Sequence, residues 1–231
     1  VSGSELEITS AGVLTFATAP DYETVNSFTA TVTASDGTNS TTQDITVNVT
    51  NVNDNSPVIT SNATFTAEEN QTAIGTVTAT DADGDDVTFT VSGSELSITS
   101  AGVLTFATAP DYETQTSYSA TVTVSDGTNT ATQDITVNVT DANDPPTFTS
   151  NATFSAAENQ TAIGTVTASD PEGDTLSFTI SGSDITIVSS SGLLEFASAP
   201  DFETQTSYSV TVTVSDGTNT VTQDITVNVT N

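Results

Sequence analysis

The chain has 231 residues, 30 Asp and Glu residues, and no Lys, Arg, His, Cys, Met or Trp, so its formal net charge is −30. This charge excludes binding to nucleic acids and to anionic membrane faces, and the absence of Cys excludes disulfides and thiolate metal sites. Without His and Lys the chain lacks the usual general bases, and no apolar run is long enough to insert into a membrane.

One sequence pattern occurs three times along the chain. The segment Ala-Pro-Asp-Tyr-Glu-Thr begins at Ala19 and at Ala109, and a version with Phe begins at Ala199. The step is 90 residues each time (109 − 19 and 199 − 109). A fixed long period is typical of tandem structural units, so we predict an array of similar domains.

The first repeat is incomplete, since Val1 aligns with Val91 in the middle of the second repeat. We predict the C-terminal part of a repeat at residues 1–51 and complete repeats at 52–141 and 142–231. The part-repeat lacks strands, so half of its core should face water. Either the sequence is an excerpt of a longer chain, which we favour, or a neighbouring copy adds the missing strands and builds a filament.

Apolar and polar residues alternate with a period of two in the second repeat, which indicates strands with one buried face. The predicted strands lie near Phe65 and at residues 74–80, 87–91, 96–98, 103–106, 118–124 and 135–139. They are separated by Ala-Gly, Ser-Gly and Asp-Gly turns, and no helical period is present. This pattern predicts an all-β fold of tandem Greek-key, immunoglobulin-like β-sandwiches with about seven strands each.

Most carboxylates lie in turns and at the joints between repeats, and few lie on strand faces. Strand-end turns gather at the two ends of a sandwich, where like charges repel each other unless a cation intervenes. The chain supplies no cation of its own. Groups of oxygen ligands without nitrogen or sulfur ligands point to Ca²⁺, whereas Mg²⁺ prefers to keep its waters.

The order of these motifs resembles that of the cadherin repeat. The matching residues are Glu69-Asn70, Gly75-Thr76-Val77, Ala79-Thr80-Asp81-Ala82-Asp83, Asp111-Tyr112-Glu113, Val124-Ser125-Asp126 and, at the joint, Asn53-Asp54-Asn55-Ser56-Pro57. The match covers nearly the whole chain and implies β-sandwiches of the cadherin type. The composition, rich in Thr and without Lys, resembles the cadherin-like repeats of large microbial surface proteins.

The resemblance implies Ca²⁺ ions, about two to three at each joint, bound between successive repeats. At the first joint the implied ligands are Asp21, Glu23, Asn53, Asp54, Asn55, Asp81, Asp83 and Asp126. At the second joint they are Glu69, Asp111, Glu113, Asp141, Asn143, Asp144, Asp170, Glu172 and Asp216. The chain departs from the family pattern where Asn51 and Glu172 replace Asp and where Pro145 replaces Asn.

Three other interpretations compete with a calcium site. An Asp before Gly favours a turn that needs no metal. A glycosidase would use a pair of carboxylates, but the acidic pairs of this chain recur in every repeat. A glycan-binding module would expose aromatic residues, whereas the few Tyr and Phe lie in strands or in the calcium motifs. Asp134 and its counterparts on strands are interpreted as solvated residues.

We therefore predict a protein that is not an enzyme and that lies outside the cell or on its surface. Its repeats would form a calcium-stiffened array, serving as the spacer of a surface adhesin or as part of an extracellular filament. The predicted partners are calcium, neighbouring repeats of the same chain and other copies in a filament. An array of carbohydrate-binding modules on an extracellular protein is the alternative.

Overall fold

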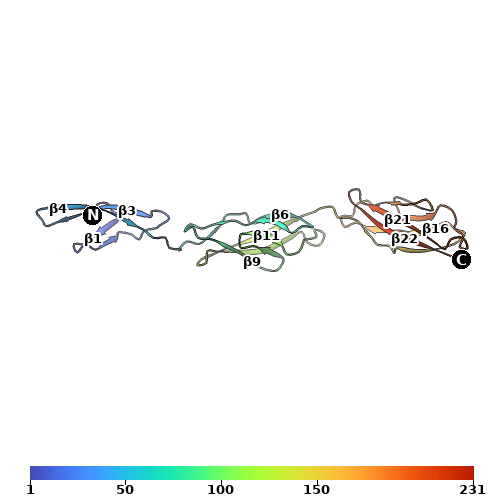
Figure 1. The fold of residues 1–231 in the computed structure, drawn as a ribbon, viewed down its shortest axis with the longest axis horizontal. Coiled ribbons are helices and arrows are strands. Elements are labelled where there is room, and N and C mark those ends of the chain that lie inside the picture. Colours follow the sequence, from blue (N-terminus) through green and yellow to red (C-terminus); the bar gives the residue numbers. More distant parts are fainter. The chain divides into compact units, whose positions relative to one another are not determined.

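The structure is a computed structural model that describes residues 1–231, and every regular element in it is a β-strand (Figure 1). The first set of strands comprises β1 (Leu6–Ile8), β2 (Leu14–Phe16), β3 (Ser27–Ser35) and β4 (Ser40–Asn48). The second set comprises β5 (Val58–Ile59), β6 (Thr64–Glu68), β7 (Ala73–Thr76), β8 (Ala79–Thr80), β9 (Thr88–Val91), β10 (Leu96–Ile98), β11 (Val103–Phe106), β12 (Ser117–Ser125) and β13 (Thr130–Thr140). The third set comprises β14 (Thr147–Phe148), β15 (Thr153–Ala157), β16 (Ala162–Thr165), β17 (Ala168–Ser169), β18 (Ser177–Ile180), β19 (Ile185–Ile187), β20 (Leu193–Phe196), β21 (Ser207–Ser215) and β22 (Thr220–Thr230).

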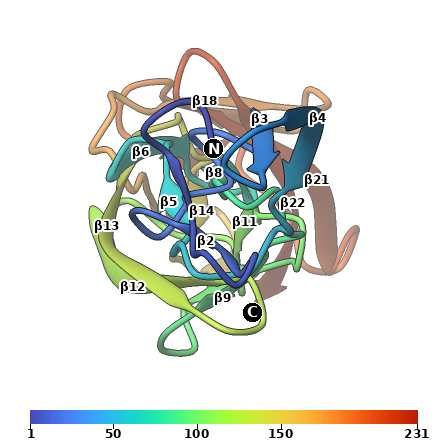
Figure 2. The ribbon, with the colours of Figure 1, turned by 90° about the vertical axis from the view of Figure 1, so that its left-hand side faces the viewer.

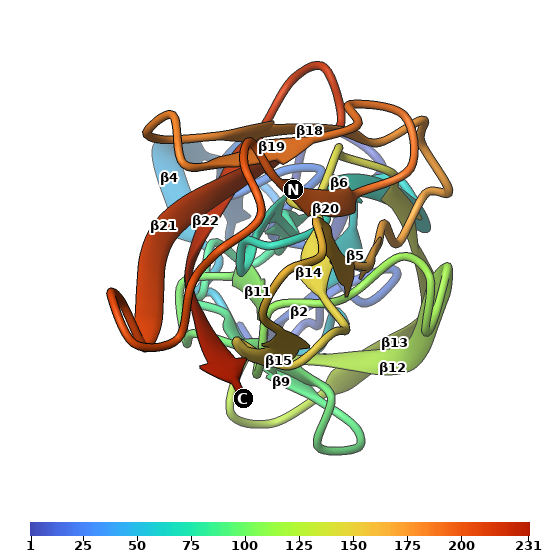
Figure 3. The same ribbon diagram turned by 90° about the vertical axis from the view of Figure 1, so that its right-hand side faces the viewer.

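The third set forms a sandwich of two main sheets (Figure 3). One sheet has the strand order β15-β22-β21-β18, and the other has the order β16-β20-β19. The short strands β14 and β17 form a separate pair. β15 runs parallel to β22, whereas the other pairs are antiparallel. This topology confirms the predicted all-β, immunoglobulin-like sandwich.

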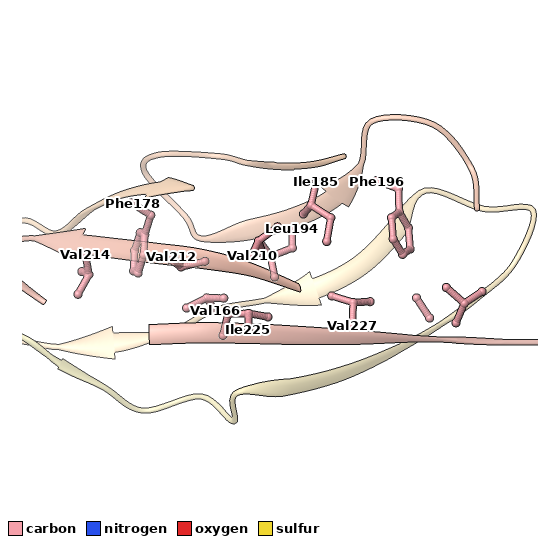
Figure 4. Close-up of a cluster of buried hydrophobic side chains, with 12 residues drawn as sticks. Val166, Phe178, Ile185, Leu194, Phe196, Val210, Val212, Val214, Ile225 and Val227 are labelled. Atoms are coloured by element: carbon pink, nitrogen blue, oxygen red, sulfur yellow. The ribbon is translucent and has the colours of Figure 1, made fainter. Parts of the chain in front are cut away.

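The core of this sandwich is built from side chains of both main sheets (Figure 4). Val212 of β21 and Ile225 of β22 are fully buried, as is Leu194 of β20. Between the buried valines of β21, Thr211 and Thr213 occupy the alternating positions and are only half-buried. Each fully buried aliphatic side chain contributes about 1.5–3 kcal/mol to stability, so the period-two pattern provides the main driving force for this fold.

The second set repeats the same strand order, with β6-β13-β12-β9 in one sheet and β10-β11-β7 in the other. The predicted strands at 96–98 and 103–106 are confirmed as β10 and β11. The predicted strand at 74–80 is wrong as a single element, because it consists of β7 and β8. β7 pairs with β11, whereas β8 pairs with β5, so the chain changes partner around Val77.

The first set contains two hairpins, β1-β2 and β3-β4 (Figure 2). Its register follows that of the second set, since Leu6 pairs with Phe16 as Leu96 pairs with Phe106. Strands equivalent to β6, β7 and β9 are not among residues 1–48. Phe16 is therefore only half-buried, whereas Phe106 is 2% exposed. The predicted partial exposure of this core is observed at Leu14, Phe16, Phe28, Val32, Ile45, Val47 and Val49.

The chain forms two compact units. The first contains residues 1–67, 71–110 and 117–139, and the second contains residues 68–70, 111–116 and 140–231. Two loops of the second repeat thus belong with the segment that follows it, and the backbone N–H of Glu69 donates to the carbonyl of Thr140 at 3.1 Å. Each predicted joint consequently lies inside one unit. The division of the chain at residues 51 and 141 remains a prediction.

The structure contains no helix with the length and apolar character needed to cross a membrane.

Candidate metal centre

Four carboxylates from separate segments converge at the second joint. Glu69 follows β6, Glu113 lies in the loop after β11, Asp144 lies in the joint segment and Glu172 follows β17. One oxygen of each side chain lies within 4.8 Å of the corresponding oxygens of the other three. The resulting group of four negative charges has no basic side chain beside it, because the chain contains none.

Glu69 is the buried centre of this arrangement, at 2% exposure. One of its carboxylate oxygens accepts a hydrogen bond from the backbone N–H of Tyr112 at 2.6 Å, and the other accepts from that of Ala142 at 2.9 Å. Asn70 adopts a left-handed backbone conformation, with φ of 60°, and its Nδ2 donates to Asp144 Oδ1 at 2.7 Å. Charge-assisted bonds of this kind hold the loops of one sandwich end against the joint segment.

At the first joint, the carboxylates of Glu23, Asp54 and Asp83 form a similar group, with oxygens within 4.8 Å of one another. A second group consists of Asp81, Asp83 and Asp85, which all lie in the turn after β8. Asp83 belongs to both groups and is 9% exposed. It therefore connects the turn of the sandwich with the joint segment.

Several carboxylate oxygens at the joints are buried but have no hydrogen-bond partner. These atoms are Asp81 Oδ2 and Asp126 Oδ2 at the first joint, and Asp170 Oδ2 and Glu172 Oε1 at the second. A buried charged oxygen without a partner is costly, and proteins normally satisfy such atoms or bind a cation there. Hard, anionic oxygen donors are what Ca²⁺ prefers, so the residues present fit this ion.

Turn hydrogen bonds account for part of the acidic pattern. Asp126 Oδ1 accepts from the backbone N–H groups of Thr128 and Asn129, both at 2.6 Å. Asp216 makes the equivalent bonds in the third set, and its Oδ2 also accepts from Asn143 Nδ2 at 2.9 Å. The turn interpretation thus explains one oxygen of Asp126 and leaves the other for a second role.

Crowding of negative charge alters the acidity of the joint glutamates. Desolvation raises the pKa of Glu113, and the charges of Glu69, Glu172 and Asp141 raise it further. Desolvation also raises the pKa of Glu172, with added repulsion from Asp170 and Asp144. At the first joint, desolvation raises the pKa of Glu23, and Asp83 contributes to the same shift. Each raised pKa indicates a site where a proton or a cation is favoured over a bare carboxylate.

These shifts predict a pH dependence for the calcium-free protein. A raised pKa in the folded state means that the contribution of Glu113 and Glu172 to stability is fully present below their ordinary pKa of 4.5 and is lost as the pH rises through the folded-state values. The melting temperature without calcium should therefore decrease as the pH is raised from 4.5 to neutral. Replacing both residues by Gln should reduce this decrease, whereas Glu95→Gln, at an exposed position away from the joints, should leave it unchanged. Identical pH profiles for the wild type and the double variant would contradict the prediction.

The structure brings together some of the predicted ligands and leaves others outside these groups. Those inside are Glu23, Asp54, Asp81, Asp83, Glu69, Glu113, Asp144 and Glu172. The predicted carboxylate ligands outside these groups are Asp21, Asp126, Asp111, Asp141, Asp170 and Asp216. Of the predicted carboxamide ligands, Asn55 donates to Asp54 and Asp83, Asn53 accepts from Asn129, and Asn143 donates to Asp216. The assignment of all these residues as ligands stays a prediction.

One further group of carboxylates was not assigned from the sequence. It consists of Glu158, Asp201 and Glu203, whose oxygens also lie within 4.8 Å of one another. These residues are the counterparts, one repeat later, of Glu69, Asp111 and Glu113. The repeat itself was therefore the signal that could have found them.

Comparison with known proteins gives both a family and a fold. A model of the family described as bacterial Ig domain matches residues 53–140 and 143–230. The chain is 37% identical over 156 residues to chitinase A of Pseudoalteromonas piscicida, and 30% identical over 232 residues to the human cadherin EGF LAG seven-pass G-type receptor 1. These matches take in 66% and 90% of the chain but only 19% and 8% of the two proteins, so the chain spans a small part of each.

Among solved structures, the protocadherin gammaB7 EC3-6 cis-dimer superposes with a TM-score of 0.62 at 22% identity. The superposition covers 100% of this chain and 67% of the protocadherin chain. At this level of identity the likeness concerns the fold alone. It confirms the cadherin-like form of the sandwiches that the sequence motifs predicted.

Proposed function

Because the chain belongs to the bacterial Ig domain family, we propose that it is a structural array of tandem sandwiches whose joints are stiffened by calcium. The observation that carries this proposal is the set of buried, unpartnered carboxylate oxygens at both joints in a chain without a single Lys, Arg or His. A cation from solution would satisfy these oxygens, because the chain has no basic side chain to do so.

At the second joint, the loops before the joint would supply Glu69, Asp111 and Glu113 to the ion. The joint segment would supply Asp141, Asn143 and Asp144, and the following sandwich Asp170, Glu172 and Asp216. The first joint would use Asp21, Glu23, Asn53, Asp54, Asn55, Asp81, Asp83 and Asp126. Bound calcium supplies the positive charge that these carboxylates lack, with about two to three ions at each joint.

Hydrogen bonds of Glu69 and Asp144 tie the segments that meet at the second joint to one another. Glu69 holds the loop at Tyr112 and the joint segment at Ala142 through its two oxygens. Asp144 accepts from Asn70 on one side, and its N–H donates to Glu172 Oε2 at 3.2 Å on the other. Repulsion among the four clustered carboxylates opposes this arrangement, so neutralising their charge stabilises it.

The proposed location is outside the cell or on its surface. Calcium-binding modules of this kind bind their ions with Kd values of about 10⁻⁴–10⁻³ M, so they need the calcium concentrations found in extracellular fluids. Similarity to protocadherin extracellular domains and to a cadherin receptor supports this location. The proposed role is that of a spacer in a surface adhesin or filament, with calcium, neighbouring repeats and other copies as partners and with no enzymatic activity.

A calcium titration of the full chain by calorimetry tests the assignment at the second joint. Asp144→Ala should weaken binding to this joint by about tenfold or more, since even groups that only support metal ligands contribute that much to affinity. The matched control is Asp134→Ala, because Asp134 lies exposed on β13 and accepts only from the Thr121 hydroxyl at 2.7 Å. Equal titration curves for the two variants would refute the assignment.

Similarity to chitinase A favours a second candidate, an array of carbohydrate-binding modules. Flat glycan sites are built from exposed aromatic rings, but each of the 10 Phe and 4 Tyr side chains is buried or half-buried. The structural array is therefore the better-supported function, and retention of the chain on insoluble chitin would favour the alternative.

A further inference from the structure

The two joint segments differ at two positions that matter for hydrogen bonding. The first joint reads Asn51-Val52-Asn53-Asp54-Asn55, and the second reads Asp141-Ala142-Asn143-Asp144-Pro145. A carboxamide side chain donates hydrogen bonds, whereas a carboxylate only accepts them and Pro has no backbone N–H. The first joint therefore has side-chain donors at both positions, whereas the second has none, and Pro145 also lacks the backbone N–H that Asn55 has.

These donors converge on one residue, Asp83, at the first joint. Asn55 Nδ2 donates to Asp83 Oδ1 at 2.9 Å and to Asp54 Oδ1 at 3.1 Å, so a single carboxamide lies between two negative charges. The backbone N–H groups of Asp54 and Asn55 both donate to Asp83 Oδ2, at 3.1 and 2.8 Å. Asn51 Nδ2 adds a bond to the backbone carbonyl of Asp83 at 2.7 Å. We call Asn51 and Asn55 the asparagine clamp.

The corresponding contact at the second joint is much weaker. Glu172 occupies the place of Asp83, and its Oε2 accepts one bond from the backbone N–H of Asp144 at 3.2 Å. Its Oε1 is buried without a partner. Pro145 has no N–H to donate, and Asp141 adds a negative charge where the first joint has a carboxamide.

The other contacts of the two joint segments also differ. At the second joint, Asn70 Nδ2 donates to Asp144 Oδ1, the Ala142 N–H donates to Glu69 Oε1, and Asn143 Nδ2 donates to Asp216 Oδ2. Asn129 Nδ2 donates to Asn53 Oδ1 and to the carbonyl of Asn55 at the first joint, both at 2.8 Å. Asn219 Nδ2 donates to the carbonyl of Asn143 at the second, at 3.1 Å. The contact between the joint segment and the acidic turn after β8 or β17 is the place where the first joint has more hydrogen bonds than the second.

From this difference we infer that the two joints depend unequally on calcium. The asparagine clamp closes the contact at Asp83 without a metal ion, because its N–H groups partly replace the missing positive charge. The second joint has a single hydrogen bond at the equivalent contact, from the Asp144 N–H to Glu172 Oε2 at 3.2 Å, so it needs a bound cation to keep this contact closed. Loss of calcium then loosens the array at the second joint and leaves the first joint in place. The inference rests on the proposed function, since it assumes that the joints bind calcium.

Amide hydrogen exchange measured by NMR on the full chain, with and without calcium, tests the inference at single residues. Without calcium, the amide of Asp144 should exchange about tenfold faster or more, as expected for losing a hydrogen bond to a charged group. The amides of Asp54 and Asn55 should keep their protection. In calcium-free protein, the double variant Asn51→Ala/Asn55→Ala should speed exchange at Asp54 by about tenfold and leave Asp144 unchanged. The control is Asn39→Ala, at an exposed turn position.

The outcomes separate the inference from the function on which it rests. Equal loss of protection at Asp54 and Asp144 on calcium removal would overturn the inference and leave the proposed function standing. An unchanged rate at Asp54 in the double variant would also overturn the inference. If calcium changed exchange at neither joint, both the inference and the proposed function would fail.

Discussion

Removal of calcium from the full chain should lower its free energy of unfolding by about 3–4 kcal/mol for each joint that was saturated. At a free concentration of ten times Kd, each independent site contributes about 1.4 kcal/mol by mass action, and about two to three sites act at a joint. A domain is stable by only about 5–15 kcal/mol, so this is a large share. Because a small domain loses about 4–8 °C of melting temperature per kcal/mol, calorimetry with and without EDTA will detect the change easily.

Two controls make this result specific. Adding calcium back should restore the melting temperature, and adding Mg²⁺ at the same concentration should restore less, because Mg²⁺ dehydrates reluctantly. Asp134→Ala should keep the full response, since Asp134 lies on a strand away from both joints. Melting curves and small-angle scattering that do not change with EDTA would refute the calcium proposal.

Gly102→Ala should destabilise the second sandwich by about 2–5 kcal/mol. Gly102 has a left-handed backbone, with φ of +85°, and a Cβ placed there would lie 2.2 Å from the carbonyl oxygen of Val77. The backbone cannot move away easily, because the Val77 N–H donates to the Gly102 carbonyl at 2.8 Å. The left-handed conformation costs an alanine about 1–2 kcal/mol, and overpacking adds about 1–3 kcal/mol. Urea denaturation of the full chain measures the loss.

Gly93→Ala is the matched control for this substitution. Gly93 has nearly the same φ, +81°, but no atom lies within 4 Å of its added Cβ. Gly93→Ala should therefore lower the stability of the sandwich by only about 1–2 kcal/mol, which is the cost of the left-handed conformation alone. Gly192 reproduces the tight contact in the third set, where a Cβ would lie 2.1 Å from the Val166 carbonyl oxygen, so Gly192→Ala should resemble Gly102→Ala. Equal losses at Gly93 and Gly102 would contradict the steric argument.

The sequence alone determined the class of fold and the places where acidic residues gather. Strands such as β10 and β11 could be located to the residue, because alternation of apolar and polar side chains reflects burial on one face of a strand. The repeat predicted an array of similar domains, and the second and third sets share their strand pairing: Val122 pairs with Val91 as Val212 pairs with Ile180, which lie 90 and 89 residues further along the chain. Both inferences depend on local pattern or on repetition, which can be read without knowing any distant contact.

Only the tertiary structure decided how residues far apart in the sequence meet. The alternating pattern at 74–80 contains no sign that β7 and β8 pair with different strands, because a partner is chosen by the whole sheet. Likewise, Asn55 and Pro145 occupy equivalent places in the repeat, but the bonds of Asn55 to Asp83 depend on how the joint segment lies against the turn after β8. Charge and hydrogen-bonding capacity belong to the residue type, whereas the partner that satisfies them is set by the packing of the folded chain.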